Sequence, residues 1–225
     1  MSASIHRLSA IVFTDIVGYT SMMGENEETA LKTLEINRKI HLKYFQNYNS
    51  TYHKQIGDGF LGVFDSVVQA AHACAFIQQE CKAENINIRI GIHEGEVIFK
   101  DNDVYGDEVN IASRIESTAA SGAIYISENV RRNLDNKTGF NVQFIKEFEL
   151  KNVKDFMNLY SLTVDIEKLP KISSLNIGEA QKSIYYKKWF KIGAYIVLAG
   201  LILFIIINHD SIYDVISGSK KQKEI

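Results

Sequence analysis

Two aspartates stand where a fold could bring acidic side chains together for chemistry. Asp58 lies between two glycines in the stretch HKQIGDGFLGVF, where two apolar runs typical of strands meet. Asp15 directly follows the apolar run LSAIVFT at residues 8–14, which predicts a buried strand. A glycine-flanked aspartate is common in a hairpin turn, because both residue types tolerate positive φ. If the two strands are neighbours, their carboxylates repel each other unless a cation lies between them, and such a pair suits Mg²⁺ or Mn²⁺ bound to a phosphate.

Residues that could bind a phosphate and a sugar lie in two further stretches. The residues IVGYT after Asp15 lead into a helical pattern, where backbone N–H groups can bind phosphate and Gly18 permits close approach. In DVYGDEVNIASRIES, Asn110 and Arg114 are four residues apart on a helix predicted over residues 107–119, so they share a face. Arginine offers a forked donor to phosphoryl oxygens, and asparagine can bond a sugar oxygen. In isolation, the two side chains would be interpreted as an exposed polar helix face.

The apolar patterns predict the elements that must position these side chains. Their order is β-α-β-β-α-β, which indicates an α+β fold: a ferredoxin-like βαββαβ sheet with helices on one face and with appended elements. The predicted core elements are a strand at 8–14, a helix at 27–45, a hairpin of 50–57 and 60–64, a helix that begins after the N-cap Ser66, and a second hairpin of 86–93 and 95–99. The appended elements are the helix at 107–119, a strand at 123–127, a helix at 128–134, and strands at 140–151 and 156–162.

The C-terminal part of the chain differs in composition from the rest. From Ile192 to Asn208 the sequence contains no charged residue, and Trp189 with nearby lysines could anchor the ends of a helix in a bilayer. The predicted organisation is a folded domain at 1–164, a linker at 165–188, a single transmembrane helix at 189–208 and a short tail at 209–225. Because lysines cluster before this helix, we expect a single-pass protein of the inner or plasma membrane whose folded domain lies in the cytoplasm.

Composition excludes several classes of partner and chemistry. The formal net charge of −2 provides no basic surface for nucleic acid. Cys74 and Cys81 are seven residues apart in a helical pattern, too far for a disulfide within one helix, and are predicted to be buried thiols. The N-terminus shows no secretory signal peptide.

Four motifs in order and spacing resemble the catalytic domain of the class III nucleotidyl cyclases, the adenylyl and guanylyl cyclase family. They are FTDIVGYT, KQIGDGF, DVYGDEVNIASR, and ELKNV followed by LY, and they span residues 8–163. Glu108 stands where glycine is frequent in this family, but it is not one of the positions that recognise the nucleobase. The resemblance implies a head-to-tail homodimer with two equivalent sites, in which one chain supplies the metal-binding aspartates and its partner reads the base.

The resemblance also assigns roles to individual residues. The implied set is Asp15, Ile16 and Asp58 for two divalent cations, Mg²⁺ or Mn²⁺; Lys54 and Asp103 for the base; Asn110 for the ribose; Arg114 for the α-phosphate; and Lys151 for the terminal phosphates. In the implied reaction, the 3′-hydroxyl of a nucleoside triphosphate attacks its own α-phosphorus and pyrophosphate leaves.

The identity of the base is open between two classes. Asp103 can accept from the N6 amino group of adenine while Lys54 donates to N1, so ATP is the first choice. Cytosine presents the same order of groups, and uracil could also satisfy the pair, so a pyrimidine cyclase of a bacterial anti-phage system is the alternative. A further alternative is a catalytically silent regulatory dimer on the membrane, against which the intact site residues argue.

Overall fold

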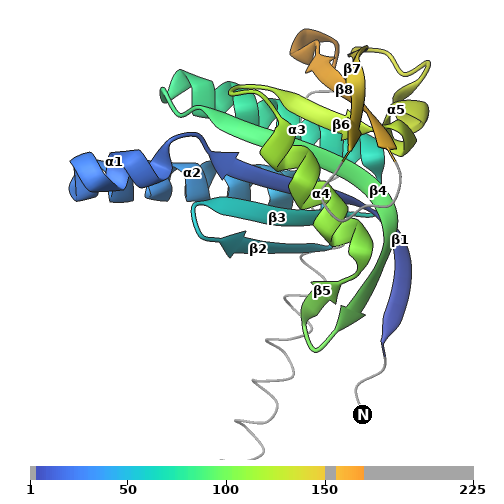
Figure 1. Cartoon of the computed structure of the whole chain (residues 1–225), viewed down its shortest axis with the longest axis horizontal. Helices are drawn as coiled ribbons and strands as arrows, with labels where there is room; N and C mark the ends of the chain where they lie inside the picture. The colour runs from blue at the N-terminus through green and yellow to red at the C-terminus, as the bar shows by residue number, and fades with distance from the viewer. Residues whose placement is uncertain (1–3, 150–155, 170–225) are drawn as a thin grey trace, which may run out of the picture. The chain divides into compact units, whose positions relative to one another are not determined.

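Two long antiparallel strands form the centre of the sheet in the computed structural model, which describes residues 4–149 and 156–169 (Figure 1). They are β1 (Ile5–Ile16) and β4 (Ile88–Lys100), paired along the whole of β1. On its other side β1 pairs with β3 (Gly59–Phe64), and β3 pairs with β2 (Tyr52–Ile56). The order β2-β3-β1-β4, antiparallel throughout, is that of a ferredoxin-like core. The predicted βαββαβ arrangement is therefore confirmed.

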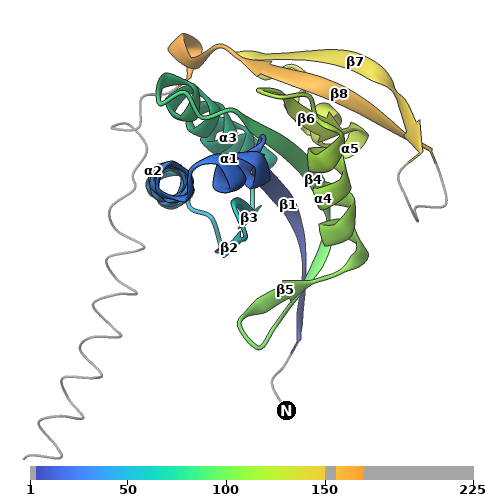
Figure 2. The same ribbon diagram turned by 60° about the vertical axis from the view of Figure 1, so that its left-hand side comes forward.

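The helices that connect these strands lie on one face of the sheet (Figure 2). They are α1 (Tyr19–Glu25), α2 (Glu27–Asn47) and α3 (Val67–Ala83). The Ser66 side chain accepts a hydrogen bond from the Gln69 N–H at the start of α3, so the predicted N-cap is confirmed. Large apolar side chains from α2, α3 and alternate positions of the strands form the main core between these layers.

The remaining elements extend the sheet beyond β4. β6 (Ile124–Ser127) runs parallel to β4, and β8 (Phe156–Val164) and β7 (Phe140–Glu149) follow in antiparallel order. The helix α5 (Glu128–Leu134) follows β6, and a 3₁₀ turn, η1 (Ile166–Lys168), follows β8. These elements agree with the predicted strands and the short helix at 128–134.

The helix α4 (Asp107–Thr118) lies on the opposite face of the sheet from α2 and α3 (Figure 2). The predicted arrangement of the core helices on one face is therefore confirmed for α2 and α3, whereas α4, predicted as an appended element, covers the other face. A Cβ at Gly91 of β4 would meet the backbone of α4 at Ala112 and Glu116, so this glycine allows the helix to lie directly on the strand. The Glu108 carboxylate forms a hydrogen bond with the ring of the buried His93 in β4, which gives Glu108 a structural role at this helix–sheet contact.

The second predicted hairpin, of residues 86–93 and 95–99, is wrong. Residues 88–100 instead form one continuous strand, β4, because β1 extends to Ile5 and pairs with β4 residue by residue. The turn lies further along, at Asp101 and Asn102, whose φ angles of 51° and 61° match a two-residue hairpin loop. The chain then returns as β5 (Asp103–Tyr105), a short strand paired with the end of β4.

Several predictions from the sequence fall outside the described residues. They are Lys151, most of the linker at 165–188, the transmembrane helix at 189–208 and the tail at 209–225. In the part of the chain that the structure describes, no helix combines the length and apolar character needed to cross a membrane. Cys74 and Cys81 are both buried and free, as predicted, and burial raises the pKa of the Cys81 thiol to about 12.

Candidate active site

The sheet brings Asp15 and Asp58 together. Asp15 lies near the end of β1, and Asp58 lies in the turn between β2 and β3, the strand that neighbours β1. Gly57 has a φ of 61°, which the turn requires. Gly59 passes so close to the carbonyl of Thr14 that a Cβ at this position would overlap it. The two glycines therefore both shape the turn and let Asp58 approach the end of β1.

The electrostatics of this pair favour a bound cation. Burial and then the negative charge of the nearby Asp15 raise the pKa of Asp58. Backbone hydrogen bonding, from Asp58 itself and then from Ile16, opposes this rise in the pKa. Within residues 4–149 and 156–169, no cluster of three or more His, Cys, Asp or Glu side chains could hold a metal. Two carboxylates nevertheless fit Mg²⁺ or Mn²⁺ when phosphate oxygens supply further ligands.

Two further charged side chains of this site, Arg89 and Glu116, are not among the residues predicted from the sequence. Arg89 lies opposite Asp15 in the β1–β4 register, and its guanidinium donates to the Asp15 carboxylate. On its other side, Arg89 Nε lies 3.3 Å from Oε1 of Glu116, a nearly buried carboxyl group on α4. Neither of these two atoms has a hydrogen-bond partner in the described structure, so the contact is an ion pair without hydrogen-bond alignment. Arg89 can be identified as part of the site only once the strand pairing is known, because that pairing places it opposite Asp15.

Glu116 makes a testable contribution to pH dependence. Burial, opposed by Arg89, raises the pKa of Glu116 to about 7 from a reference value of 4.5. The folded state thus binds more protons than the unfolded state between these values, and stability falls as the pH rises through this range. We expect Glu116→Gln to remove this part of the decline between pH 5 and pH 8, as measured by urea unfolding at each pH. The exposed Glu27→Gln should leave the wild-type decline in place, and an equal decline in Glu116→Gln would contradict the assignment.

Lys54 and Asp103 form a second polar cluster on β2 and β5. Lys54 Nζ lies 2.7 Å from Oδ2 of Asp103, and the Tyr52 hydroxyl donates to Oδ1 at 2.7 Å. The backbone N–H of Val104 also donates to this oxygen at 3.0 Å. These partners, Lys54 first, lower the pKa of Asp103 to about 2, so its carboxylate is ionised and can only accept hydrogen bonds.

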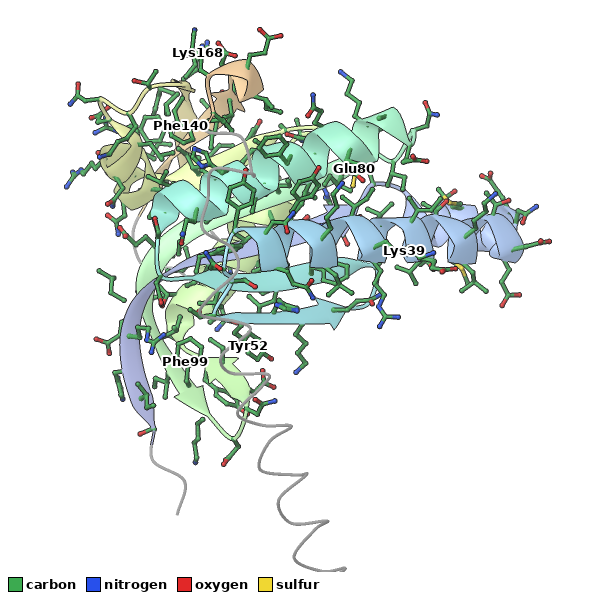
Figure 3. All side chains as sticks on the ribbon, turned by 180° about the vertical axis from the view of Figure 1, so that it is seen from behind. Lys39, Tyr52, Glu80, Phe99, Phe140 and Lys168 are labelled. Atoms are coloured by element: carbon green, nitrogen blue, oxygen red, sulfur yellow. The ribbon has the colours of Figure 1, made fainter. Side chains whose placement is uncertain are left out.

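Tyr52 is a residue of this cluster that the sequence interpretation did not include. It lies two positions before Lys54 on the same face of β2, and strand periodicity is the signal that could have identified it. Its ring packs with the apolar cluster that includes Phe99 on β4, and both side chains are labelled in Figure 3. The phenol is therefore held against Asp103 by packing as well as by its hydrogen bond.

The other predicted residues lie at separate places in the described structure. Asn110 is exposed and Arg114 is half-buried on α4, one turn apart. Gly18 precedes α1 with a φ of 77°, so its conformation is the left-handed one that favours glycine. Among the described residues, no hydrogen bond or ion pair joins Asn110 or Arg114 to the aspartate pair.

Comparison with known proteins identifies the family. The fold and the site define an α+β domain with a ferredoxin-like core and two juxtaposed carboxylates, and the family model described as the adenylate and guanylate cyclase catalytic domain matches residues 2–164. The chain belongs to this family of class III nucleotide cyclases.

Relatives in sequence agree with this assignment. The chain is 30% identical over 164 residues to "Putative adenylate cyclase 3" of Rhizobium meliloti (strain 1021), with 69% of this chain and 28% of that protein covered. It is 31% identical over 194 residues to "Adenylate cyclase" of Anabaena cylindrica, with 72% and 38% covered. The chain thus spans about a third of the length of these relatives.

Solved structures agree as well. The adenylate/guanylate cyclase/hydrolase of Silicibacter pomeroyi matches with a TM-score of 0.66 at 27% identity, covering 72% of this chain and 100% of that one. The core of a rhodopsin-guanylyl cyclase with converted specificity, solved with ATPαS, matches with a TM-score of 0.60 at 30% identity, covering 72% and 99%.

Proposed function

We propose that the chain converts a nucleoside triphosphate to its 3′,5′-cyclic nucleotide and pyrophosphate, with two divalent cations held by Asp15 and Asp58. The observation that carries this proposal is the juxtaposition of the two carboxylates at the ends of neighbouring strands. Burial and then repulsion from Asp15 raise the pKa of Asp58, and a bound cation would relieve that repulsion. A silent regulatory dimer is the less favoured alternative, because the cyclase site residues are intact.

The proposed catalysis requires positioning and charge stabilisation rather than a protein nucleophile. When bound, the cations would lower the pKa of the 3′-hydroxyl and offset the charge of the phosphates. Arg114 would stabilise the charge that develops at the α-phosphate, and Asn110 would orient the ribose. Lys151 would bind the terminal phosphates, and Arg89, beside Asp15, is placed to bind a phosphate oxygen as well.

The Asp103 carboxylate favours a substrate whose nucleobase carries an exocyclic amino group. Its carboxylate is ionised and acceptor-only, so it can accept from the amino group of adenine, while the Lys54 ammonium donates to the adjacent ring nitrogen. ATP is therefore the first proposed substrate.

One observation favours the alternative of a pyrimidine substrate. The Tyr52 phenol is bonded to Asp103 and adds an aromatic ring at the base-recognition position. A pyrimidine is smaller than a purine and fits more easily beside such a ring. CTP presents the same amino group and ring acceptor as ATP, and UTP could also satisfy the pair, which would suit a cyclic CMP or cyclic UMP signal in anti-phage defence.

We further propose that the active unit is a homodimer and that residues 189–208 anchor it in the membrane with the catalytic domain in the cytoplasm. One structural relative, at 26% identity and a TM-score of 0.59, is a guanylyl cyclase domain from Blastocladiella emersonii described as a non-canonical dimer. The support for the anchor is the uncharged sequence itself.

The test is incubation of the purified full chain with each of the four ribonucleoside triphosphates and Mn²⁺, followed by identification of products by mass spectrometry. We expect one cyclic nucleotide to dominate, and cyclic AMP would support the first choice. A cyclic pyrimidine nucleotide would replace it with the alternative. If the dimeric, folded protein forms no cyclic product from any of the four, the proposed activity is wrong.

A further inference from the structure

A buried polar bridge lies against the aspartate pair from the side of α2. Asn37 and His41 are one helical turn apart in α2, and their exposed fractions are 1% and 0%. Asn37 Nδ2 donates to the backbone carbonyl of Asp58 at 3.1 Å. The His41 ring bonds at 2.9 Å to the hydroxyl of Thr14, the residue that precedes Asp15. A single turn of α2 thus contacts both chain segments that carry the carboxylates.

The partners of His41 fix the direction of each hydrogen bond. His41 Nδ1 lies 2.9 Å from the backbone carbonyl of Asn37, which can only accept, so Nδ1 carries the proton. Burial lowers the pKa of His41 to about 4, so the ring is neutral and Nε2 is an acceptor. The Thr14 hydroxyl therefore donates to Nε2, and its oxygen accepts from the Phe60 N–H at 3.2 Å. Each polar group of this chain has a defined donor or acceptor role.

Packing fixes the same side chains in place. The His41 ring is stacked on Phe60, with centroids 4.5 Å apart, and is edge-on to Phe45. The Cys81 thiol lies 3.5 Å from Asn37 Oδ1, which agrees with the orientation that directs the Asn37 amide NH₂ toward Asp58. The bridge therefore has one arrangement rather than several.

We propose that Asn37 and His41 are positioning residues of the cation site, which hold Asp15 and Asp58 at a fixed separation through Thr14 and the Asp58 carbonyl. This inference rests on the proposed function of the two aspartates. Two like charges tend to separate, so a site that awaits a cation needs support from the surrounding structure. Because His41 is neutral and the other members are uncharged, the bridge supplies this support without adding a charge that would compete with the cation.

The test compares variants of Thr14 and of two buried histidines. Thr14→Val keeps the shape of the side chain and removes the hydroxyl group, whereas Thr14→Ser keeps the hydroxyl group. His41→Phe keeps the aromatic stack and removes both ring hydrogen bonds. His72→Phe is the matched control, because His72 is also buried and in contact with aromatic rings, Tyr48 and Phe140, but lies on α3.

The readout is Mn²⁺ affinity by isothermal titration of the purified full chain, with cyclase activity measured in parallel. We expect Thr14→Val and His41→Phe each to weaken Mn²⁺ binding about tenfold or more, the range typical for the loss of an outer-shell partner. Thr14→Ser and His72→Phe should stay within about threefold of wild type, on the same scale.

Two results would overturn the inference. One is unchanged Mn²⁺ affinity in Thr14→Val, which decides the matter even if His41→Phe does not fold. The other is an equal loss in His72→Phe, because the effect would then reflect general loss of core stability. These results differ from failure of the proposed function, which would appear as Mn²⁺ binding that Asp15→Asn does not alter and as absence of cyclic product from the wild type.

Discussion

Asp58→Asn is expected to reduce cyclase activity at least about 1000-fold while the protein remains folded. A bound cation contributes several kcal/mol to the stabilisation of charge in the transition state, and each 1.36 kcal/mol corresponds to a tenfold change in rate. The asparagine side chain has nearly the same shape but lacks the negative charge that binds the cation. The measurement is the initial rate of cyclic product formation with saturating Mn²⁺, alongside thermal unfolding.

The same variant should be at least as stable as wild type near neutral pH. Because the pKa of Asp58 is raised in the folded state, the folded protein binds more protons than the unfolded chain just above the ordinary aspartate pKa, and stability falls as the pH rises through that range. The uncharged amide of the variant does not titrate, so it would not take part in this loss. Asp135→Asn, at an exposed position after α5, is the control that should keep its activity. Substantial activity in Asp58→Asn, or a collapse of its unfolding temperature, would contradict the assigned role.

The sequence was sufficient to predict the core of the fold because each element has a local signal. The apolar run before Asp15, the glycine-flanked Asp58 and the N-cap Ser66 are all short-range patterns, and the structure has β1, the β2–β3 turn and α3 at these places. The predicted strand at 8–14 is shorter than β1, which runs from Ile5 to Ile16. Its first residues, such as Ile5, are exposed, so pairing with β4 rather than burial makes them a strand.

The errors in the fold come from interactions that no short window of sequence contains. A turn was predicted between residues 93 and 95, but the long partner β1 keeps β4 extended through this point, and the Glu108 side chain of α4 lies where a Cβ at Gly95 would be. Glycine at this position serves close packing by α4 rather than a turn. The same helix could not be assigned to a face of the sheet from its own periodicity.

The candidate site shows the same contrast between residues with a local sequence signal and residues brought in by long-range contacts. Asp15 and Asp58 were found from local motifs, whereas Arg89 and Glu116 join them only through strand register and the docking of α4. His41 was also missed, because in the sequence it is one more residue in an amphipathic helix. Side chains that position or neutralise the site are therefore distributed over elements distant in sequence, and their roles become visible only after folding.

A mixture of two inactive chains is expected to recover activity if the site is shared between subunits. Asp15→Ala removes a cation ligand and Lys54→Ala removes a base-reading residue, and in the proposed homodimer these belong to opposite partners at each site. A mixed dimer of the two variants would have one site with both defects and one intact site. Since random exchange makes about half of the dimers mixed, with one intact site of two, recovery should approach about a quarter of wild-type activity.

The control for this experiment is a mixture of Asp15→Ala with Asp58→Ala. Both residues lie in the same chain at the junction of β1 and β3, so every site of this mixed dimer lacks a cation ligand and no activity should return. Native mass spectrometry measures the fraction of mixed dimers in each case. If mixed dimers of Asp15→Ala and Lys54→Ala form and stay inactive, Lys54 and Asp15 serve the same site, and the geometry of one chain must then bring both to a single nucleotide.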